Sequence, residues 1–402
     1  EDGDDAPPRR MVGVALGLET LARRRGPEGG SAALRARLRQ LTAYDRGGEA
    51  AIRVPTLAFL ALAATGGVAP EVAARGMAHP AAAVRRAAVL ARGAGAPPPA
   101  GSELDRIMED PAAPVRIEGV RILARGSRTA RVCARLLAAT DDPSSAVRLE
   151  AVDALAEPCP GGVEQRAVLE ALATSVDPAD ALDWHRPAHA LLALARLDPP
   201  AASRHLPTFV AHDSPFARAW AARAAGEADD TAGLRALLRD PSDNVRTAAL
   251  PGLVRIQGRA ADPVLLATVA EREDPQLVMT AARLLEGTDR REAAAMASLV
   301  ALGRFSREEM ETHRDVRLAL LDRVAATGDT ARVRDVEPYL RDYDPAVAAR
   351  AAEVLREWTG QRWIAAPRGP DPLARPDVAD IGAMREGRVV LHMARGGSVE
   401  LA

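Results

Sequence analysis

Two histidines in the middle of the chain, His185 and His189, stand four residues apart. On a helix this spacing places two imidazoles on one face, where they could share a metal ion. However, no Glu follows His185 as in a zinc-protease helix, and Pro187 between them suggests that the helix begins only near Asp183. We therefore interpret the pair as structural and expect no metal or other cofactor.

The chain has two cysteines, Cys133 and Cys159. Cys133 falls early in one expected helix, and Cys159 lies just past the end of the helix expected to pair with it. Because these ends meet in an antiparallel hairpin, a disulfide is one interpretation. Two separate thiols that simply pack, as small buried Cys often do, is the other and the one we favour. A disulfide would indicate an oxidising compartment.

Several classes of catalytic chemistry are excluded by composition. All 53 basic residues are Arg, so the chain has no lysine for a Schiff base, for a Walker A phosphate loop or for a kinase site. Serines and histidines are scattered, with no G-x-S-x-G or comparable nucleophile motif. We assign no catalytic residue, and whether the chain is an enzyme stays open.

A repeated pattern dominates the chain: Asp-Pro, a few small or polar residues, Val-Arg, and then a run rich in Ala and Leu. The clearest copies read DPAAPVRIEGVRIL from Asp110, DPSSAVRLEAVDAL from Asp142 and DPSDNVRTAALPGL from Asp240. Weaker copies begin at His79, Asp213, Asp274 and Asp344. The Arg of Val-Arg, or its equivalent, marks ten copies at 53, 85, 116, 148, 186, 218, 246, 279, 317 and 348. Most intervals are about 32 residues, but 148 to 186 and 279 to 317 are longer and predict loop insertions or kinks.

Each copy predicts a helix. Asp is a good N-cap, and Pro suits the first helical position. In the copy from Asp142, apolar residues recur as one helical stripe at Val147, Ala151, Ala154 and Leu155. Another amphipathic segment precedes each copy, so the unit is a helical hairpin that must stack on its neighbours to bury its stripe. We expect second helices to start near Pro111, Pro143, Pro241, Pro275 and Pro345.

The motif Asp-Pro-x-x-x-Val-Arg-x-x-Ala resembles the second helix of the HEAT-repeat family, in its short bacterial form, over residues 31–358. The resemblance implies an all-α, α-α superhelix of about ten repeats, with the second helices on the concave side. It also implies a ladder in which Asp and Arg of adjacent repeats pair, here Asp110, Arg116, Asp142, Arg148, Asp240 and Arg246. Met279 and Ala348 depart from the motif because each stands where the Arg is expected.

Four segments are predicted along the chain: a disordered acidic leader at 1–8, the repeats with an N-terminal capping helix at 9–358, a Pro-rich linker at 359–386 and a β-hairpin at 387–402. The hairpin is predicted because GRVVLHMARGGSVELA alternates apolar and polar residues on both sides of a Gly-Gly turn. It resembles the opening of a cyclophilin-type peptidyl-prolyl isomerase. That resemblance implies a truncated cyclophilin-like domain whose catalytic residues would all lie beyond Ala402.

The expected partner is a protein or peptide. A net charge of −2 argues against nucleic acid as the main partner, and no apolar run is long enough to span a membrane. Trp184, Arg186, Arg218, Trp220 and Arg223 fall on neighbouring second helices and form a candidate partner-binding patch. Core packing and ladder pairing explain the same residues, and we favour that interpretation.

We therefore interpret the chain as a protein-interaction scaffold, the N-terminal part of a HEAT–cyclophilin isomerase. The alternative is a HEAT-like enzyme that acts through its concave face, similar to a bilin lyase or a DNA glycosylase. The Arg-only, Ala-rich composition is typical of a GC-rich bacterial genome. An exported protein with its signal removed and a cytoplasmic protein both fit the acidic start, and the oligomeric state is not predicted.

Overall fold

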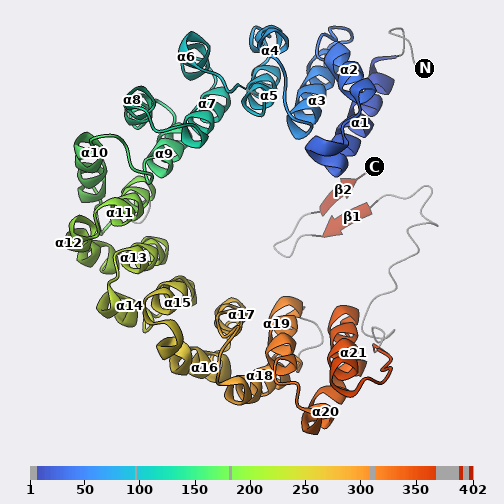
Figure 1. Cartoon of the computed structure of the whole chain (residues 1–402), viewed down its shortest axis with the longest axis vertical. Helices are drawn as coiled ribbons and strands as arrows, with labels where there is room; N and C mark the ends of the chain where they lie inside the picture. The colour runs from blue at the N-terminus through green and yellow to red at the C-terminus, as the bar shows by residue number, and fades with distance from the viewer. Residues whose placement is uncertain are drawn as a thin grey trace. The chain divides into compact units, whose positions relative to one another are not determined.

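The computed structural model of the chain describes residues 7–95, 97–180, 183–307, 313–367, 389–392 and 398–401. The described residues form helices almost throughout, joined by short turns (Figure 1). They divide into two compact units, unit 1 up to Ile256 and unit 2 from Gln257. Most of the predicted leader, and residues 368–388 of the predicted linker and hairpin start, lie outside the described residues.

The described residues of unit 1 form one long helix, kinked at Gly26, followed by seven helical hairpins. Its helices are α1 (Pro8–Gly29), α2 (Ala32–Leu41), α3 (Ala50–Ala64), α4 (Pro70–Met77), α5 (Ala82–Gly93), α6 (Gly101–Met108), α7 (Ala113–Arg125), α8 (Ala130–Ala139), α9 (Ser145–Ala154), α10 (Val163–Thr174), α11 (His185–Leu197), α12 (Pro199–Val210), α13 (Pro215–Glu227), α14 (Thr231–Leu237) and α15 (Asp243–Gln257).

Unit 2 continues the same alternation. Its elements are the 3₁₀ helix η1 (Gly258–Ala261), α16 (Asp262–Glu271), α17 (Pro275–Leu284), α18 (Arg291–Phe305), α19 (Arg314–Ala325), η2 (Thr330–Arg332), α20 (Val333–Val336), η3 (Glu337–Arg341), α21 (Pro345–Thr359), and the strands β1 (Val389–His392) and β2 (Ser398–Leu401). Each of the ten marker positions falls in its own odd-numbered helix, from α3 to α21.

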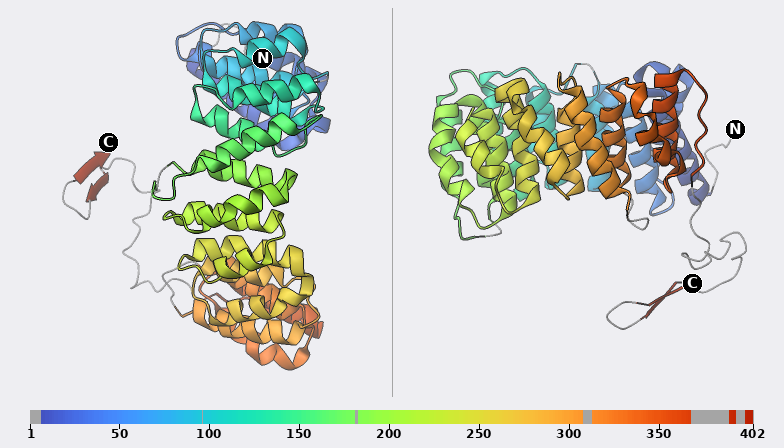
Figure 2. Two further views of the ribbon diagram at one scale, coloured as in Figure 1. Left: turned by 90° about the vertical axis from the view of Figure 1, so that its left-hand side faces the viewer. Right: turned by 90° about the horizontal axis from the view of Figure 1, so that it is seen from below.

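The hairpins of unit 1 form two layers of helices. The odd-numbered helices lie on the inner side of the curved row and the even-numbered ones on the outer side (Figure 1). Figure 2 shows the same helices stacked side by side, with their axes across the row. Apolar stripes of both layers meet in two buried clusters, one from α1 to α5 and one from α5 to α15. We call the exposed side of the odd-numbered helices of unit 1 its inner face.

The Asp-Pro turn differs from the predicted N-cap. Helices α7, α9 and α15 begin two residues after the Pro, and the Asp Oδ1 accepts a hydrogen bond from the amide two residues on, as Asp142 does from Ser144 at 2.8 Å. Asp110 and Asp240 make the same bond with Ala112 and Ser242. The carboxylate thus closes a local Asx-type turn and keeps its remaining lone pairs for another partner. At α17 the prediction is correct, because Asp274 caps the helix through Leu277.

Beyond α21 the structure describes an irregular segment and a pair of short strands. Residues 361–367 lack regular structure but stay attached to unit 2, since the amide of Ala366 donates to the carbonyl of Leu340 at 2.8 Å. Strands β1 and β2 pair antiparallel, with Val389 opposite Leu401. The predicted Gly-Gly turn lies outside the described residues.

Candidate interaction surface

Arginines at the marker positions tie consecutive hairpins together. Arg116 on α7 donates from Nε and Nη2 to both carboxylate oxygens of Asp142, at 2.8 and 2.7 Å. Its Nη1 donates to the main-chain oxygen of Asp110 at 2.7 Å, so one guanidinium joins its own turn to the next one. Arg85 with Asp110, and Arg218 with Asp240, repeat this arrangement. A planar fork held by two parallel bonds fixes the spacing of neighbouring hairpins.

Two of the expected ladder residues behave differently. Arg148 donates to the main-chain oxygens of Asp142 and Pro143, at 2.8 and 3.1 Å, and no described carboxylate pairs with it. The longer interval that follows does contain an Asp-Pro step, Asp177-Pro178, but the guanidinium of Arg148 stays with its own turn instead. Arg246 likewise stays within its own turn, bonded to the Asp240 carbonyl and to Asp243.

The contrast between Arg116 and Arg148 gives a testable prediction. We expect Arg116→Ala to lower the free energy of unfolding of the α7–α9 region by about 2–3 kcal/mol, because the pair with Asp142 is largely buried and its loss leaves a carboxylate unpaired. Arg148→Ala, the matched control, should cost about 1 kcal/mol because only bonds to carbonyls are lost. Native-state hydrogen exchange of α7 and α9 measures both. Equal losses in the two variants would contradict the ladder interpretation.

The ladder should also make stability depend on pH. The pKa of Asp142 is lowered by the hydrogen bond from Arg116, against the opposing effect of burial. A carboxyl whose pKa is lower in the folded state stabilises the fold above its unfolded pKa of about 4, and this contribution disappears as pH falls through the folded value. Below pH 4 we therefore expect α7 and α9 to lose protection from exchange more steeply in the parent chain than in Asp142→Asn. Identical pH profiles would exclude the carboxylate as the cause.

A second polar row runs along the inner face. Arg121 on α7 donates to both oxygens of Glu150 on α9, at 3.0 and 3.1 Å. Further along, Asp153 on α9 lies 2.6 Å from Nδ1 of His189 on α11. In each case a residue near the end of one inner helix meets a residue near the middle of the next. His185, the other histidine of the pair that we interpreted as structural, stacks on Trp184 with centroids 3.8 Å apart.

Aromatic side chains gather where this row reaches α13. Trp184 stacks on Phe216 with centroids 6.1 Å apart, and His189 lies against Trp220 at 3.9 Å. The guanidinium of Arg223 lies over the Trp220 ring, 4.8 Å from its centroid. Phe216 is 56% exposed although it is a large apolar residue. We call Phe216, Trp220 and Arg223 the α13 stripe, because they recur at i, i+4 and i+7 on one side of that helix.

The structure separates the five residues predicted for a partner-binding patch. Trp184, Trp220 and Arg223 belong to the aromatic group just described. Arg218 instead belongs to the ladder with Asp240, and Arg186 bonds the Thr140 carbonyl and Asp141 at 2.7 and 3.2 Å.

Sequence reasoning missed Phe216 and assigned no surface role to His185 and His189. Phe216 stands four residues before Trp220 and seven before Arg223, and this helical spacing could have identified Phe216 as part of the same surface.

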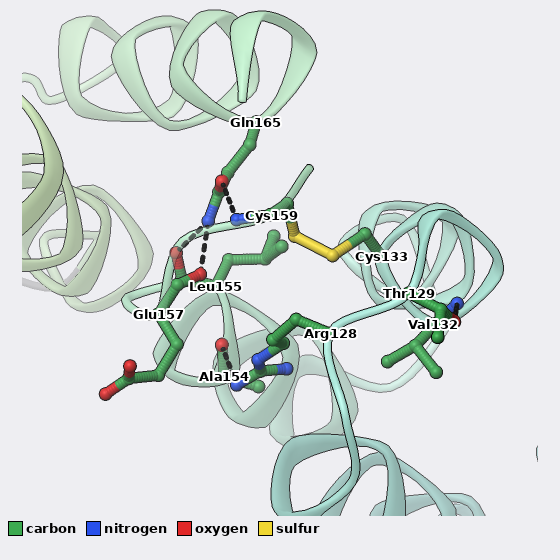
Figure 3. The surroundings of a disulfide bond; sticks show 9 residues. All are labelled: Arg128, Thr129, Val132, Cys133, Ala154, Leu155, Glu157, Cys159 and Gln165. Carbon is green, nitrogen blue, oxygen red and sulfur yellow. Dashed lines mark hydrogen bonds between the residues drawn. A yellow bond between two sulfur atoms is a disulfide. The ribbon is translucent and has the colours of Figure 1, made fainter. Parts of the chain in front are cut away.

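The two cysteines are joined by a disulfide between the start of α8 and the loop after α9, with Cα atoms 6.0 Å apart (Figure 3). Buried Gln165 of α10 holds the same loop: its Nε2 donates to the carbonyls of Leu155 and Glu157 at 2.6 and 2.7 Å, and its Oε1 accepts from the Cys159 amide. The disulfide therefore holds the loop that opens the longer interval after Arg148, where that arginine lacks a carboxylate partner.

Metal-binding clusters and membrane-spanning helices are both absent from the described part of the chain. No three His, Cys, Asp or Glu side chains gather closely enough there to hold a metal ion. None of its helices is both long and apolar enough to cross a membrane.

Comparisons with known proteins identify a fold. No family model and no curated protein matches the sequence. Among solved structures, yeast importin-β (Kap95p) matches with a TM-score of 0.52 and 13% identity, over 88% of this chain and 55% of that one. YibA of E. coli matches with a TM-score of 0.42 and 17% identity, over 64% of this chain and 93% of that one. The described chain is an α solenoid of the HEAT-repeat type, and it spans about half the length of importin-β.

Proposed function

We propose that this chain is a protein-interaction scaffold that binds a polypeptide partner on the inner face of unit 1. The observation that carries the proposal is the aromatic group at α11 and α13, where Phe216 stays largely exposed while it stacks on buried Trp184. Rigid aromatic side chains with exposed faces are typical anchors of protein interfaces, because they bury a large area at little cost in conformational entropy.

The solenoid itself supports this function. A stack of hairpins presents one continuous surface built from the same side of successive helices, which suits an extended partner. Polar side chains on the inner face of α7, α9 and α11 are already held by ion pairs or hydrogen bonds, as Arg121, Glu150 and His189 are. Because these side chains are already held in place, binding of a partner costs little conformational entropy at this surface.

The test is a selection of random 12-residue peptides on the whole chain. We expect enriched peptides that compete with one another and bind Phe216→Ala at least about tenfold more weakly, as loss of an interface anchor predicts. The matched control is Val163→Ala, which removes an apolar side chain that is 71% exposed on outer helix α10 and should leave binding unchanged. An absence of enriched peptides, or equal binding to both variants, would refute the proposal.

The finer proposal is that the bound partner is delivered to a cyclophilin-like prolyl isomerase. It rests on the resemblance of residues 387–402 and on the antiparallel pairing of β1 with β2. The structural comparisons add nothing to it. It predicts that a longer product of the same gene catalyses cis–trans isomerisation of an X-Pro peptide while this chain alone does not. Activity of this chain, or inactivity of a product that continues past Ala402, would contradict it.

A further inference from the structure

We propose that the α13 stripe recognises an extended partner segment in which an apolar side chain and a carboxylate stand three residues apart. This inference rests on the proposed scaffold function and names the chemistry of the partner. Phe216 and Arg223 are seven residues apart on α13, which separates their backbone positions by about 10 Å along the helix axis. Three residues of an extended chain in the polyproline II conformation span about 9 Å, and the three residues per turn place both side chains on the same side.

The charge requirement comes from Arg223. Among the described residues no carboxylate pairs with this guanidinium, although it is exposed on the inner face. Glu227 lies one turn further along α13, but it accepts a hydrogen bond from Arg196 on α11 at 3.0 Å. Arg223 therefore offers a positive charge that the hairpin stack leaves uncompensated.

The same repeat positions on other inner helices show why the Arg223 charge has no carboxylate beside it. Five residues after the marker Arg116, Arg121 reaches Glu150, which stands two residues after the marker Arg148. Arg223 occupies the same place after Arg218, but the residue two places after Arg246 is Ala248. The next inner helix thus presents a methyl group at the position where α7 and α9 present Glu118 and Glu150. A carboxylate from a partner would complete the row.

The apolar requirement comes from the other end of the stripe. Phe216 is supported from behind by Trp184, so its exposed face is held in place for contact with a partner side chain. Trp220 lies between, with His189 against its ring and Arg223 over it. The partner's acid is therefore directed toward Arg223 and its apolar group toward Phe216.

The experiment uses a defined probe on the full chain. The acetylated and amidated peptide Gly-Ser-Phe-Gly-Ser-Glu-Gly-Ser, labelled with a fluorophore, is titrated alongside versions with Gln or Lys in place of Glu. We expect the Glu peptide to bind at least about tenfold more tightly than the Gln peptide, and Arg223→Glu to prefer the Lys peptide instead. A fourth peptide ending in a free carboxylate at the same position separates a side-chain acid from a chain terminus.

Arg204→Gln is the matched control, since Arg204 is an exposed, ion-paired arginine on outer helix α12 and its loss should change no affinity. Peptide selection on the parent chain and on Arg223→Glu then separates the two proposals. If neither chain enriches any peptide, the scaffold function fails and the inference fails with it. If both chains enrich the same peptides regardless of charge, or if the Glu and Gln probes bind equally, the inference is overturned while the scaffold function stands.

Discussion

Replacing Arg317 by Met should lower the free energy of unfolding of unit 2 by about 3–5 kcal/mol. The Arg317 side chain on α19 is fully buried, and its Nη1 donates to both carboxylate oxygens of Asp342 at 2.7 and 2.6 Å. Its guanidinium also lies over the Tyr343 ring, 4.4 Å from the centroid. Removing this cation leaves the buried Asp342 carboxylate without its partner, which costs far more than losing an exposed ion pair.

A second variant distinguishes an unpaired charge from lost packing. The double variant Arg317→Met, Asp342→Asn removes both charges of this pair, and the Asn oxygen can still accept the bond from the Asp344 amide that Asp342 accepts at 2.8 Å. We expect it to regain most of the lost stability. Native-state hydrogen exchange of α19 and α21 measures both changes. A loss below about 1 kcal/mol in the single variant, or equal losses in both, would contradict this account.

Removing the disulfide should have the next largest effect. For a bridge between residues 26 apart in sequence, loop-closure entropy predicts a loss of about 3.5 kcal/mol in the double variant Cys133→Ala, Cys159→Ala. The effect should concentrate in α8 and α9, because Arg148 supplies no carboxylate pair to the next hairpin there. Hydrogen exchange of these helices with and without a reductant measures it.

The parent chain and the double cysteine variant serve as controls for each other when both are treated with reductant. Reductant should speed exchange in the parent chain and leave the double variant unchanged. Gln165→Leu serves as a noncovalent comparison, since it removes bonds to the same loop while the bridge remains. If reductant does not affect α8 and α9 of the parent chain, the disulfide is not a stabilising link. A stabilising bridge would favour the exported of the two compartments considered for this protein.

The helical hairpins were predictable from sequence because their signals are local. Each marker position lies in its own helix, since apolar spacing and Asp-Pro turns act within one hairpin. The details of the turns were less predictable: Asp142 was expected to cap α9 but closes a turn before it, because the same oxygen also serves a neighbouring hairpin. The hydrogen bonds of Arg148 to the carbonyls of its own turn could not be predicted, since they depend on how the longer interval from 148 to 186 folds.

The candidate surface was predictable in part for a similar reason. Trp184, Trp220 and Arg223 were candidates for the patch because they recur on neighbouring inner helices, although core packing was the interpretation that we favoured. The role of Phe216 depends on a stacking contact with a residue 32 positions earlier, and motif spacing does not show such a contact. Arg186 and Arg218 were assigned to the same patch because distance along the sequence does not reveal which carboxylate or carbonyl an arginine reaches.

Hydroxyl-radical footprinting of the full chain, with and without a selected peptide, tests the central claim most directly, namely that the inner face of unit 1 binds a polypeptide. We predict that bound peptide slows oxidation of Phe216 and Trp220 several-fold, because it covers their exposed faces. Trp358, whose Nε1 donates to the Ala325 carbonyl in unit 2, should react at the same rate in both samples. Protection confined to the outer helices, or unchanged oxidation of Phe216 and Trp220 at saturating peptide, would contradict the account.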